Sequence, residues 1–231
     1  VEINETNFPD DTFRYYVKNN CDKNRDGYLS EEEIKAVTKI DVPKTLTKDL
    51  TGIEYITELK TLDCSSSYLT ELDLSKNTAL MDLDCSNSFL TTLDVSGCTA
   101  LTDLDCSNNA LTALDLSQNT ELQNLNCSGQ SVRLEVVRGA DETWSADLAA
   151  LVTGWKEHFE TITVSPEEVW DQQTDTVAWS KGTVRPVVAY DYDTEFTDYF
   201  YNPPVPVKMD VKITLVPLGV GTEADLSLIH I

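Results

Sequence analysis

Short segments in which apolar and polar residues alternate recur along the middle of this chain at a regular spacing. Each 21-residue unit holds two similar halves, such as Leu62-Asp63-Cys64-Ser65 and Leu72-Asp73-Leu74-Ser75. Alternation is the pattern of a strand, and repetition at a fixed period is the pattern of a solenoid. The chain is therefore predicted to coil turn by turn, with two short extended segments per turn and leucines pointing inward. The repeating leucines, separated alternately by 10 and 11 residues, are Leu59, Leu69, Leu80, Leu90, Leu101, Leu111 and Leu122.

A polar or small residue is expected inside each half-turn. An inward polar side chain can bind backbone groups of the turn, each of which would cost ~1–3 kcal/mol if left unpaired. Ser or Cys occupies three of these six positions, which predicts a slightly weaker ladder. The positions are Ser67, Ser88 and Asn109 in the first halves, and Asn77, Cys98 and Asn119 in the second.

Cysteines recur at the same spacing of 21 residues, at Cys64, Cys85, Cys106 and Cys127. Stacked turns give parallel Cα–Cβ bonds, whereas a disulfide needs its two Cβ atoms to converge to ~3.8 Å. These cysteines are therefore predicted to be small buried hydrophobes rather than disulfide partners. Free thiols on an exported protein indicate a reducing or anaerobic habitat.

The pattern L-x-x-L-x-C-x-x-N-x-L resembles a leucine-rich repeat in a short bacterial form. Matching copies run from Leu59 to about Gln130, and weaker capping turns are expected at 40–42 and 134–136. The resemblance implies a mainly β fold, built on a leucine-rich repeat solenoid with 21-residue repeats.

Residues 22–33 read DKNRDGYLSEEE and match the EF-hand calcium loop at each ligand position. The alternating side chains supply oxygens, and Gly27 allows the sharp turn. Flanking patterns predict a helix over roughly 11–20 capped by Asp10, and a second helix that starts with a capping box of Ser30 and Glu33. The predicted calcium ligands are Asp22, Asn24, Asp26, Tyr28, Ser30 and Glu33.

An alternative interpretation makes this loop a polar turn between two helices, with Glu33 serving only as a cap. Because the ligand pattern and both helices coincide, we predict one structural calcium ion. EF-hands normally pair, and this chain has one such loop, so the helix pair is expected to cap the first repeat, which starts at Ile40.

The order of these motifs, NFPDDTF, one EF-hand-like loop and then LDCS-type repeats, resembles secreted or cell-surface leucine-rich repeat proteins of anaerobic Gram-positive gut bacteria. The resemblance covers about 1–137. It implies export, a modular extracellular protein and a non-catalytic binding role. The calcium ligands carry over from that family, whereas no binding residues of the repeats do.

The last third of the chain differs in composition, since all four tryptophans lie there. A helical turn is expected at 148–152, and alternating runs predict strands at 161–165, 176–180, 184–192 and 207–216. The aromatic residues form either a core and cap or a carbohydrate platform. The expected divisions are a helical cap at 1–39, the solenoid at 40–137 and a β-rich, sandwich-like domain at 138–225. Residues 226–231, LSLIHI, resemble the translated end of a sequencing adapter and are expected to be an artefact.

The charge and the composition of the chain exclude several classes of function. The chain carries 17 basic and 40 acidic residues, a net charge of -23, which argues against binding nucleic acid or an anionic membrane surface. It has no apolar run long enough to cross a membrane, and its two histidines are too few for a His-rich metal centre. Both ends are expected to be incomplete, so that a signal peptide is expected to be missing from this segment. Since no nucleophile elbow, phosphate loop or Cys-x-x-Cys pair is present, an enzyme is not expected.

Outward-pointing aspartates recur from turn to turn. They indicate either a ligand-binding face or a charged surface that keeps the protein soluble. A binding face would take a basic protein, a cation or an amine-bearing glycan; charged strands can also simply discourage association edge to edge. We expect an extracellular binding or adhesion module for a protein or glycan ligand, with a stalk for an unseen catalytic or anchoring domain as the alternative. The three rows are Asp41, Asp63, Asp84, Asp105 and Asn126; Thr61, Asp82, Asp103 and Asn124; and Asp73, Asp94, Asp115 and Glu135.

Overall fold

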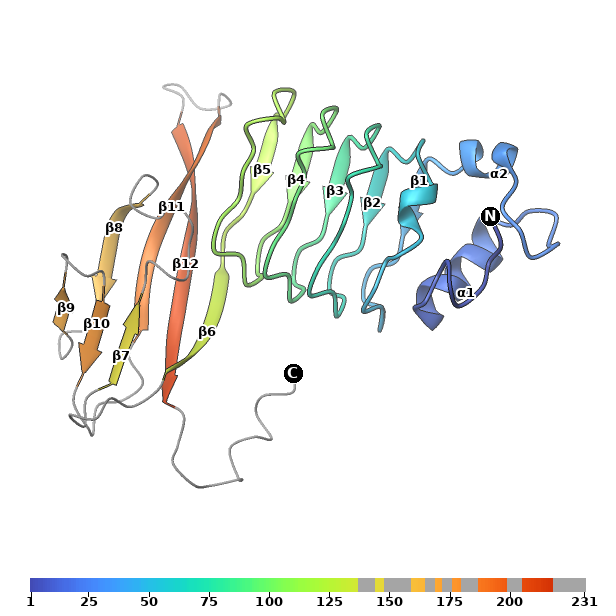
Figure 1. Cartoon of the computed structure of the whole chain (residues 1–231). Coiled ribbons are helices and arrows are strands. Elements are labelled where there is room, and N and C mark those ends of the chain that lie inside the picture. The colour runs from blue at the N-terminus through green and yellow to red at the C-terminus, as the bar shows by residue number, and fades with distance from the viewer. Residues whose placement is uncertain are drawn as a thin grey trace.

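A helical N-terminus leads into a stack of coils, followed by longer strands (Figure 1). The computed structural model describes the side chains of residues 1–131 and the backbone of residues 1–136, 144–147, 159–164, 169–171, 176–179, 187–198 and 205–217. The expected helical turn at 148–152 and the segment 226–231 lie outside these residues. None of the described helices is long and apolar enough to cross a membrane.

Two helices form the N-terminal cap, as the sequence predicts. Helix α1 spans Asp11–Asn20, and Asp10 caps it by accepting the N–H of Phe13 at 2.8 Å. Helix α2 spans Glu31–Ala36 and begins with the predicted capping box of Ser30 and Glu33. It is one turn and a half long, so its position depends on contacts made by the loop before it.

Five short parallel strands form one sheet along the coils, each pairing in register with the residue one repeat away. This confirms the predicted β-solenoid, and its first strand contains Ile40 of the expected capping turn. The turn between the first two strands includes a 3-10 helix, η1, at Ile53–Tyr55. The strands are β1 (Lys39–Asp41), β2 (Thr61–Asp63), β3 (Asp82–Asp84), β4 (Asp103–Asp105) and β5 (Asn124–Asn126).

The second extended segment expected in each coil is not a strand. Its one pairing among the described residues is an isolated bridge between Asp73 and Asp94. The backbone instead closes tight local turns: Asn77 N donates to Leu74 O at 2.9 Å, and the same bond recurs one coil later. Because these amides bond within their own coil, they are not free to form a ladder with the next one.

Leucines and cysteines fill the interior of the coils, as predicted. All six cysteines are buried free thiols. Burial raises the pKa of Cys64, Cys85 and Cys106 far above the ordinary value of a thiol, because the thiolate would lose its hydration. The predicted role of small buried hydrophobe is therefore confirmed for these residues.

A ladder of buried polar side chains joins each coil to its neighbour, also as predicted. Asn109, 4% exposed, donates through Nδ2 to Cys85 O and Cys106 O at 3.0 Å, and its Oδ1 accepts the N–H of Leu90 at 3.0 Å. Gln130, which the sequence analysis does not place in the ladder, makes the equivalent bonds one coil later. The ladder therefore accepts a longer amide at its end.

The serine and cysteine side chains of the ladder make weaker hydrogen bonds than its amide side chains. Ser67 and Ser88 share one hydroxyl contact at 3.1 Å, and Cys98 reaches Leu74 O through Sγ at 3.7 Å. On either side of Cys98, the Oδ1 atoms of Asn77 and Asn119 are buried without a hydrogen-bond partner. The weaker ladder that the sequence predicts is present.

The remaining strands form two further sheets. One sheet has the order β7-β10-β9 and the other β6-β12-β11-β8. The predicted strands at 161–165, 176–180, 184–192 and 207–216 are confirmed with shifted ends, and the sequence analysis missed β7 and β9. The bounds are β6 (Gln130–Val136), β7 (Trp144–Asp147), β8 (Phe159–Val164), β9 (Val169–Asp171), β10 (Thr176–Trp179), β11 (Val187–Asp198) and β12 (Val205–Pro217).

The expected capping turn at 134–136 lies instead in strand β6. This strand leaves the stack after Gln130 and pairs in parallel with β12, Val211 opposite Gln130 and Pro217 opposite Val136. Strand β12 is thus antiparallel to β11 on one side and parallel to β6 on the other. A local pattern cannot distinguish these two neighbours, because both present the same alternation.

Candidate functional site

The predicted calcium loop lies between α1 and α2 and is held by bonds from its own backbone. Asp22, 2% exposed, accepts the N–H of Arg25 at 2.6 Å and that of Gly27 at 3.0 Å. Arg25 and Gly27 have φ angles of 62° and 85°, so the chain winds around this carboxylate. The left-handed conformation at Gly27 is the one that glycine adopts without strain.

Glu33, the last predicted ligand, reaches back to the start of the loop. Its Oε1 accepts the N–H of Lys23 at 2.8 Å and of Asn24 at 3.2 Å, while its Oε2 accepts Ser30 N and Ser30 Oγ. These hydrogen bonds, led by those from Ser30, lower the pKa of Glu33 from 4.5 to about 2. Glu33 therefore caps α2, as the alternative interpretation requires, and also closes the loop.

The middle ligands face one another. Asn24 Nδ2 donates to Asp26 Oδ2 at 3.0 Å, and Asn24 Oδ1 accepts the N–H of Asp26 at 2.9 Å. Asp26 Oδ1 accepts the N–H of Tyr28 at 2.8 Å. All of the predicted ligands thus lie on one loop, and each carboxylate among them is bonded to loop amides.

An all-oxygen donor set of this kind suits a hard cation such as calcium. Within the described part of the chain, however, no three or more His, Cys, Asp or Glu side chains converge closely enough to hold a metal ion. The residues fit calcium by their chemistry and by the path of the loop. Binding would have to replace internal hydrogen bonds made by Asp26 and Glu33.

The loop is also paired with the N-terminal segment. Val1 and Leu29 exchange two backbone hydrogen bonds, each 2.7 Å long, and Ile3 N donates to Gly27 O at 2.9 Å. Glu2 and Tyr28 form the antiparallel bridge between them. Residues 1–3 thus lie as a short extended segment along residues 27–29 of the loop. The sequence analysis missed this pairing.

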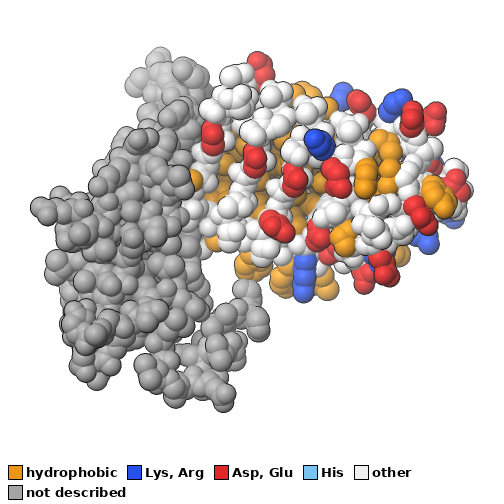
Figure 2. Space-filling model, in the orientation of Figure 1, with side chains coloured by type: hydrophobic (Ala, Val, Ile, Leu, Met, Phe, Trp, Pro, Cys, Tyr) orange, Lys and Arg blue, Asp and Glu red, His pale blue; other side chains and the backbone are white. Residues whose placement is uncertain are grey.

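The outward face of the β1–β5 sheet carries two rows of side chains. We call them the strand-start row (Lys39, Thr61, Asp82, Asp103 and Asn124) and the strand-end row (Asp41, Asp63, Asp84, Asp105 and Asn126). Acidic side chains recur from coil to coil on the face shown in Figure 2. Two of the three acidic rows predicted from the sequence thus lie on this face, whereas Asp73, Asp94 and Asp115 of the third row lie in the second half-coils.

The aspartates of the strand-end row hold the turns that follow the strands. Asp63, Asp84 and Asp105 each accept, through Oδ1, the N–H of the serine two residues later at 3.0 Å. Asp73 and Asp94 make the same bond in the second half-coil, which lowers their pKa. Such Asx turns end an extended segment and start the bend. The signal was present in the sequence as a serine two places after each aspartate.

The strand-start row is charged mainly at its centre. Asp103 receives Asn124 Nδ2 at 2.6 Å and Thr102 Oγ1 at 2.7 Å, so its charge is partly compensated. For Asp82, partial burial first, and then the neighbouring charge of Asp103, raises the pKa. Asp82, in strand β3, therefore lies among other carboxylates of this face, those of Asp103, Asp84 and Asp63.

An aromatic pair lies outside both rows. Tyr68 and Phe89 occupy the same position in adjacent coils and stack with ring centroids 5.8 Å apart and an interplanar angle of 25°. They are 44% and 38% exposed. This pair was not predicted from the sequence, although its 21-residue spacing was visible.

Three comparisons with known proteins bear on this chain. Residues 86–108 match the family model described as Leucine Rich repeat. Internalin J of Listeria monocytogenes is 42% identical over 71 residues, which are 31% of this chain and 8% of that protein. The matched part of this chain therefore spans less than a tenth of the length of that relative.

Solved structures of listerial internalins are similar in part. The functional domain of InlJ, which includes a cysteine ladder, matches with 20% identity and a TM-score of 0.44 over 82% of this chain and 50% of that one. Internalin InlF matches with 20% identity and a TM-score of 0.48 over 56% of this chain and 46% of that one. These likenesses add nothing to what the coils themselves show, namely a β-solenoid whose strands β2 to β5 recur every 21 residues.

Proposed function

We propose that this chain is a non-catalytic extracellular binding or adhesion module, secreted or held at a bacterial cell surface, whose acidic sheet face meets a protein or glycan. The observation that carries the proposal is the repetition of carboxylates from coil to coil on a sheet in strict register, where Asp82 lies near Asp103, Asp84 and Asp63. Since Lys39 is the one cation in the two rows, a partner bearing amines or guanidinium groups would be attracted. The match to internalin J supports the surface-protein part of the proposal.

The proposal includes one structural calcium ion in the N-terminal cap. Asp22, Asn24, Asp26, Tyr28, Ser30 and Glu33 would hold it. What supports this is the all-oxygen donor set and the winding of the loop around the buried Asp22 carboxylate. Calorimetry with calcium on the whole chain tests it: one site is expected for the native chain and none for Asp22→Ala with Glu33→Ala.

Binding by the acidic face is tested with two immobilised probes, a decalysine peptide and gastric mucin. The double variant Asp82→Asn with Asp103→Asn removes two charges from the face and is expected to weaken decalysine binding about tenfold, at ~0.7 kcal/mol per exposed charge. Asp73→Asn with Asp94→Asn removes the same charge elsewhere and keeps both turns, so it should bind like the native chain. Equal losses in the two variants would mean that only net charge matters.

A structural stalk remains the second candidate, because the strand-end aspartates already have a task as turn caps. A stalk needs no ligand. Absence of binding to either probe at low salt would favour it over the binding module.

A further inference from the structure

We propose that the calcium loop regulates the N-terminal end of the acidic face, because the loop, the segment 1–10 and helix α1 form one latch on the first coil. The inference rests on the proposed calcium site. It concerns what this chain's own residues do with that site, namely fasten strand β1.

The first part of the latch is the strand pairing already described. Gly27 and Leu29 are loop residues, and they hold Ile3 and Val1 through three backbone hydrogen bonds of 2.7–2.9 Å. Leu29 is 2% exposed, so the pairing continues into the core. Winding or unwinding of the loop therefore acts directly on the N-terminal segment.

The second part anchors that segment to the first coil. Phe8 is fully buried against Phe13 and Tyr55, with ring centroids 6.0 and 5.9 Å away. Its ring lies so close to Gly52 that a Cβ there would be 2.2 Å from Phe8 Cδ1. Glycine at this position is thus required by the anchor.

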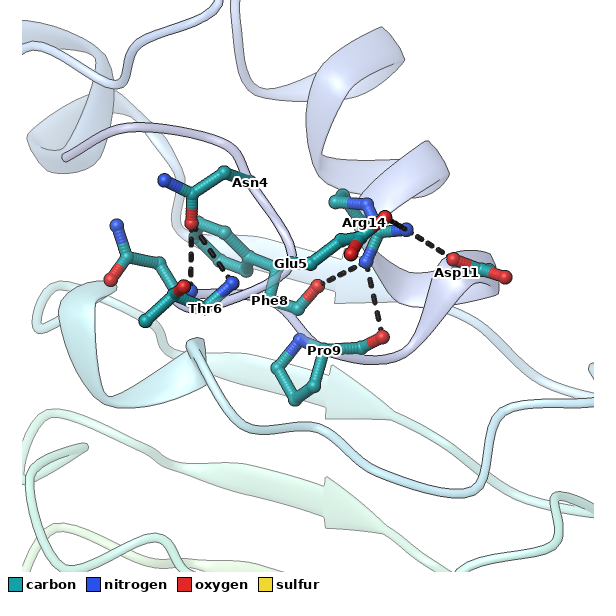
Figure 3. Close-up of polar contacts among 8 residues, drawn as sticks. Asn4, Glu5, Thr6, Phe8, Pro9, Asp11 and Arg14 are labelled. Atoms are coloured by element: carbon teal, nitrogen blue, oxygen red, sulfur yellow. Dashed lines mark hydrogen bonds and ion pairs between the residues drawn. The ribbon is translucent and has the colours of Figure 1, made fainter.

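Arg14 of α1 holds the backbone at Phe8 and Pro9 through hydrogen bonds, as Figure 3 shows. Its Nη1 donates to Phe8 O at 2.6 Å and to Pro9 O at 3.0 Å, and its Nη2 contacts the carboxylate of Asp11. Asn4 turns the chain just before this point by accepting the N–H groups of Thr6 and Asn7 at 3.0 Å. The segment is therefore a continuous hydrogen-bonded path from loop to coil.

The third part reaches the sheet. Tyr16 accepts the N–H of Asp41 through its hydroxyl at 3.2 Å, which satisfies an edge amide of strand β1. Asp10 accepts the N–H of Lys48 at 2.9 Å while it caps α1. Lys39 and Asp41 are the first members of the two rows on the face, so the latch positions the N-terminal end of both.

Hydrogen exchange of single amides in the whole chain, followed by NMR with and without calcium, tests this coupling. At free calcium 100 times the Kd, the ratio of closed to open latch rises about 100-fold. The exchange rate of every amide that exchanges only through opening of the latch falls by the same factor. We expect the amides of Leu29 and Asp41 to slow equally. The amide of Leu90, bonded to Asn109 deep in the coils, is the reference and should not change.

Two variants separate the parts of the latch. Tyr16→Phe removes the hydroxyl and keeps the ring; Leu29 should still slow about 100-fold in calcium, whereas the effect at Asp41 should fall below tenfold. Tyr15→Phe, on the exposed side of the same helix, is the matched control and should behave like the native chain. Gly52→Ala should give the same separation by displacing Phe8 without changing the loop.

The outcomes distinguish the two proposals. Calcium binding with slower exchange at Leu29 and no change at Asp41 overturns the latch and leaves the calcium site standing. Absence of any binding heat overturns both. Equal slowing of Leu29 and Asp41 in native protein, lost at Asp41 in Tyr16→Phe and in Gly52→Ala but kept in Tyr15→Phe, supports the latch.

Discussion

Replacing Asn109 with alanine tests whether the polar ladder stabilises the coils beyond the burial of leucines. The side chain bonds three buried backbone groups, Leu90 N–H, Cys85 O and Cys106 O, each at 3.0 Å. Cys106 O also accepts a hydrogen bond from Gln130 Nε2 at 3.0 Å, so alanine leaves Leu90 N–H and Cys85 O without their ladder partner. At ~1 kcal/mol for each of these two groups, the lower limit for an unpaired buried group, the loss of unfolding free energy is about 2 kcal/mol.

The loss is measured by urea unfolding followed by circular dichroism. The native chain and the variant are compared with the same slope of unfolding free energy against urea concentration. Asn108→Gly is the matched control, because Asn108 is exposed and has a φ of 54° that glycine adopts without strain. The control is expected to change the free energy by less than about 0.5 kcal/mol. A loss below about 1 kcal/mol for Asn109→Ala would refute the reasoning, since the coils would then be held by apolar packing alone.

Three further outcomes follow from the structure. Because the folded pKa of Glu33 is lowered from 4.5 to about 2, its contribution to stability is present above pH 4.5 and is lost as the pH falls toward 2; Glu33→Gln should flatten that acid limb in melting curves. All six cysteines should resist a thiol reagent at pH 8 in native protein and react fully in denaturant, whereas disulfides in the row would contradict the stacked coils. Cys98→Asn should raise the unfolding free energy by about 1 kcal/mol, since Asn77 and Asn119 each donate two hydrogen bonds where Cys98 makes one; an unchanged midpoint in urea would contradict this.

The sequence predicted the solenoid well because every coil contacts only its neighbours. A contact between residues 21 positions apart is then visible as a repeat, and the cores of β2 to β5, the buried cysteines and the amide ladder all have that spacing. The caps of both helices were also predictable. Asp10 and Ser30 bond backbone groups three residues away, so the whole interaction lies within one short window.

The candidate sites were predictable only in part. The ligand pattern placed Asp22 and Glu33 on one loop, but it could not show that Glu33 would bond Lys23 N and Asn24 N. The aspartate rows were visible, yet their use as turn caps depends on the backbone bending toward the serine. The raised pKa of Asp82 depends on its partial burial and on the carboxylates that the fold brings beside it.

By itself, then, the sequence determined the period, the inward and outward faces, the helix caps and the order of the loop ligands. Each of these repeats or is local, so it leaves a pattern in neighbouring positions. The tertiary structure decided the pairing of Val1 with Leu29, of Tyr16 with Asp41, and of β6 with β12. These contacts join segments at unrelated separations, and their energy depends on a geometry that exists only after both segments have folded.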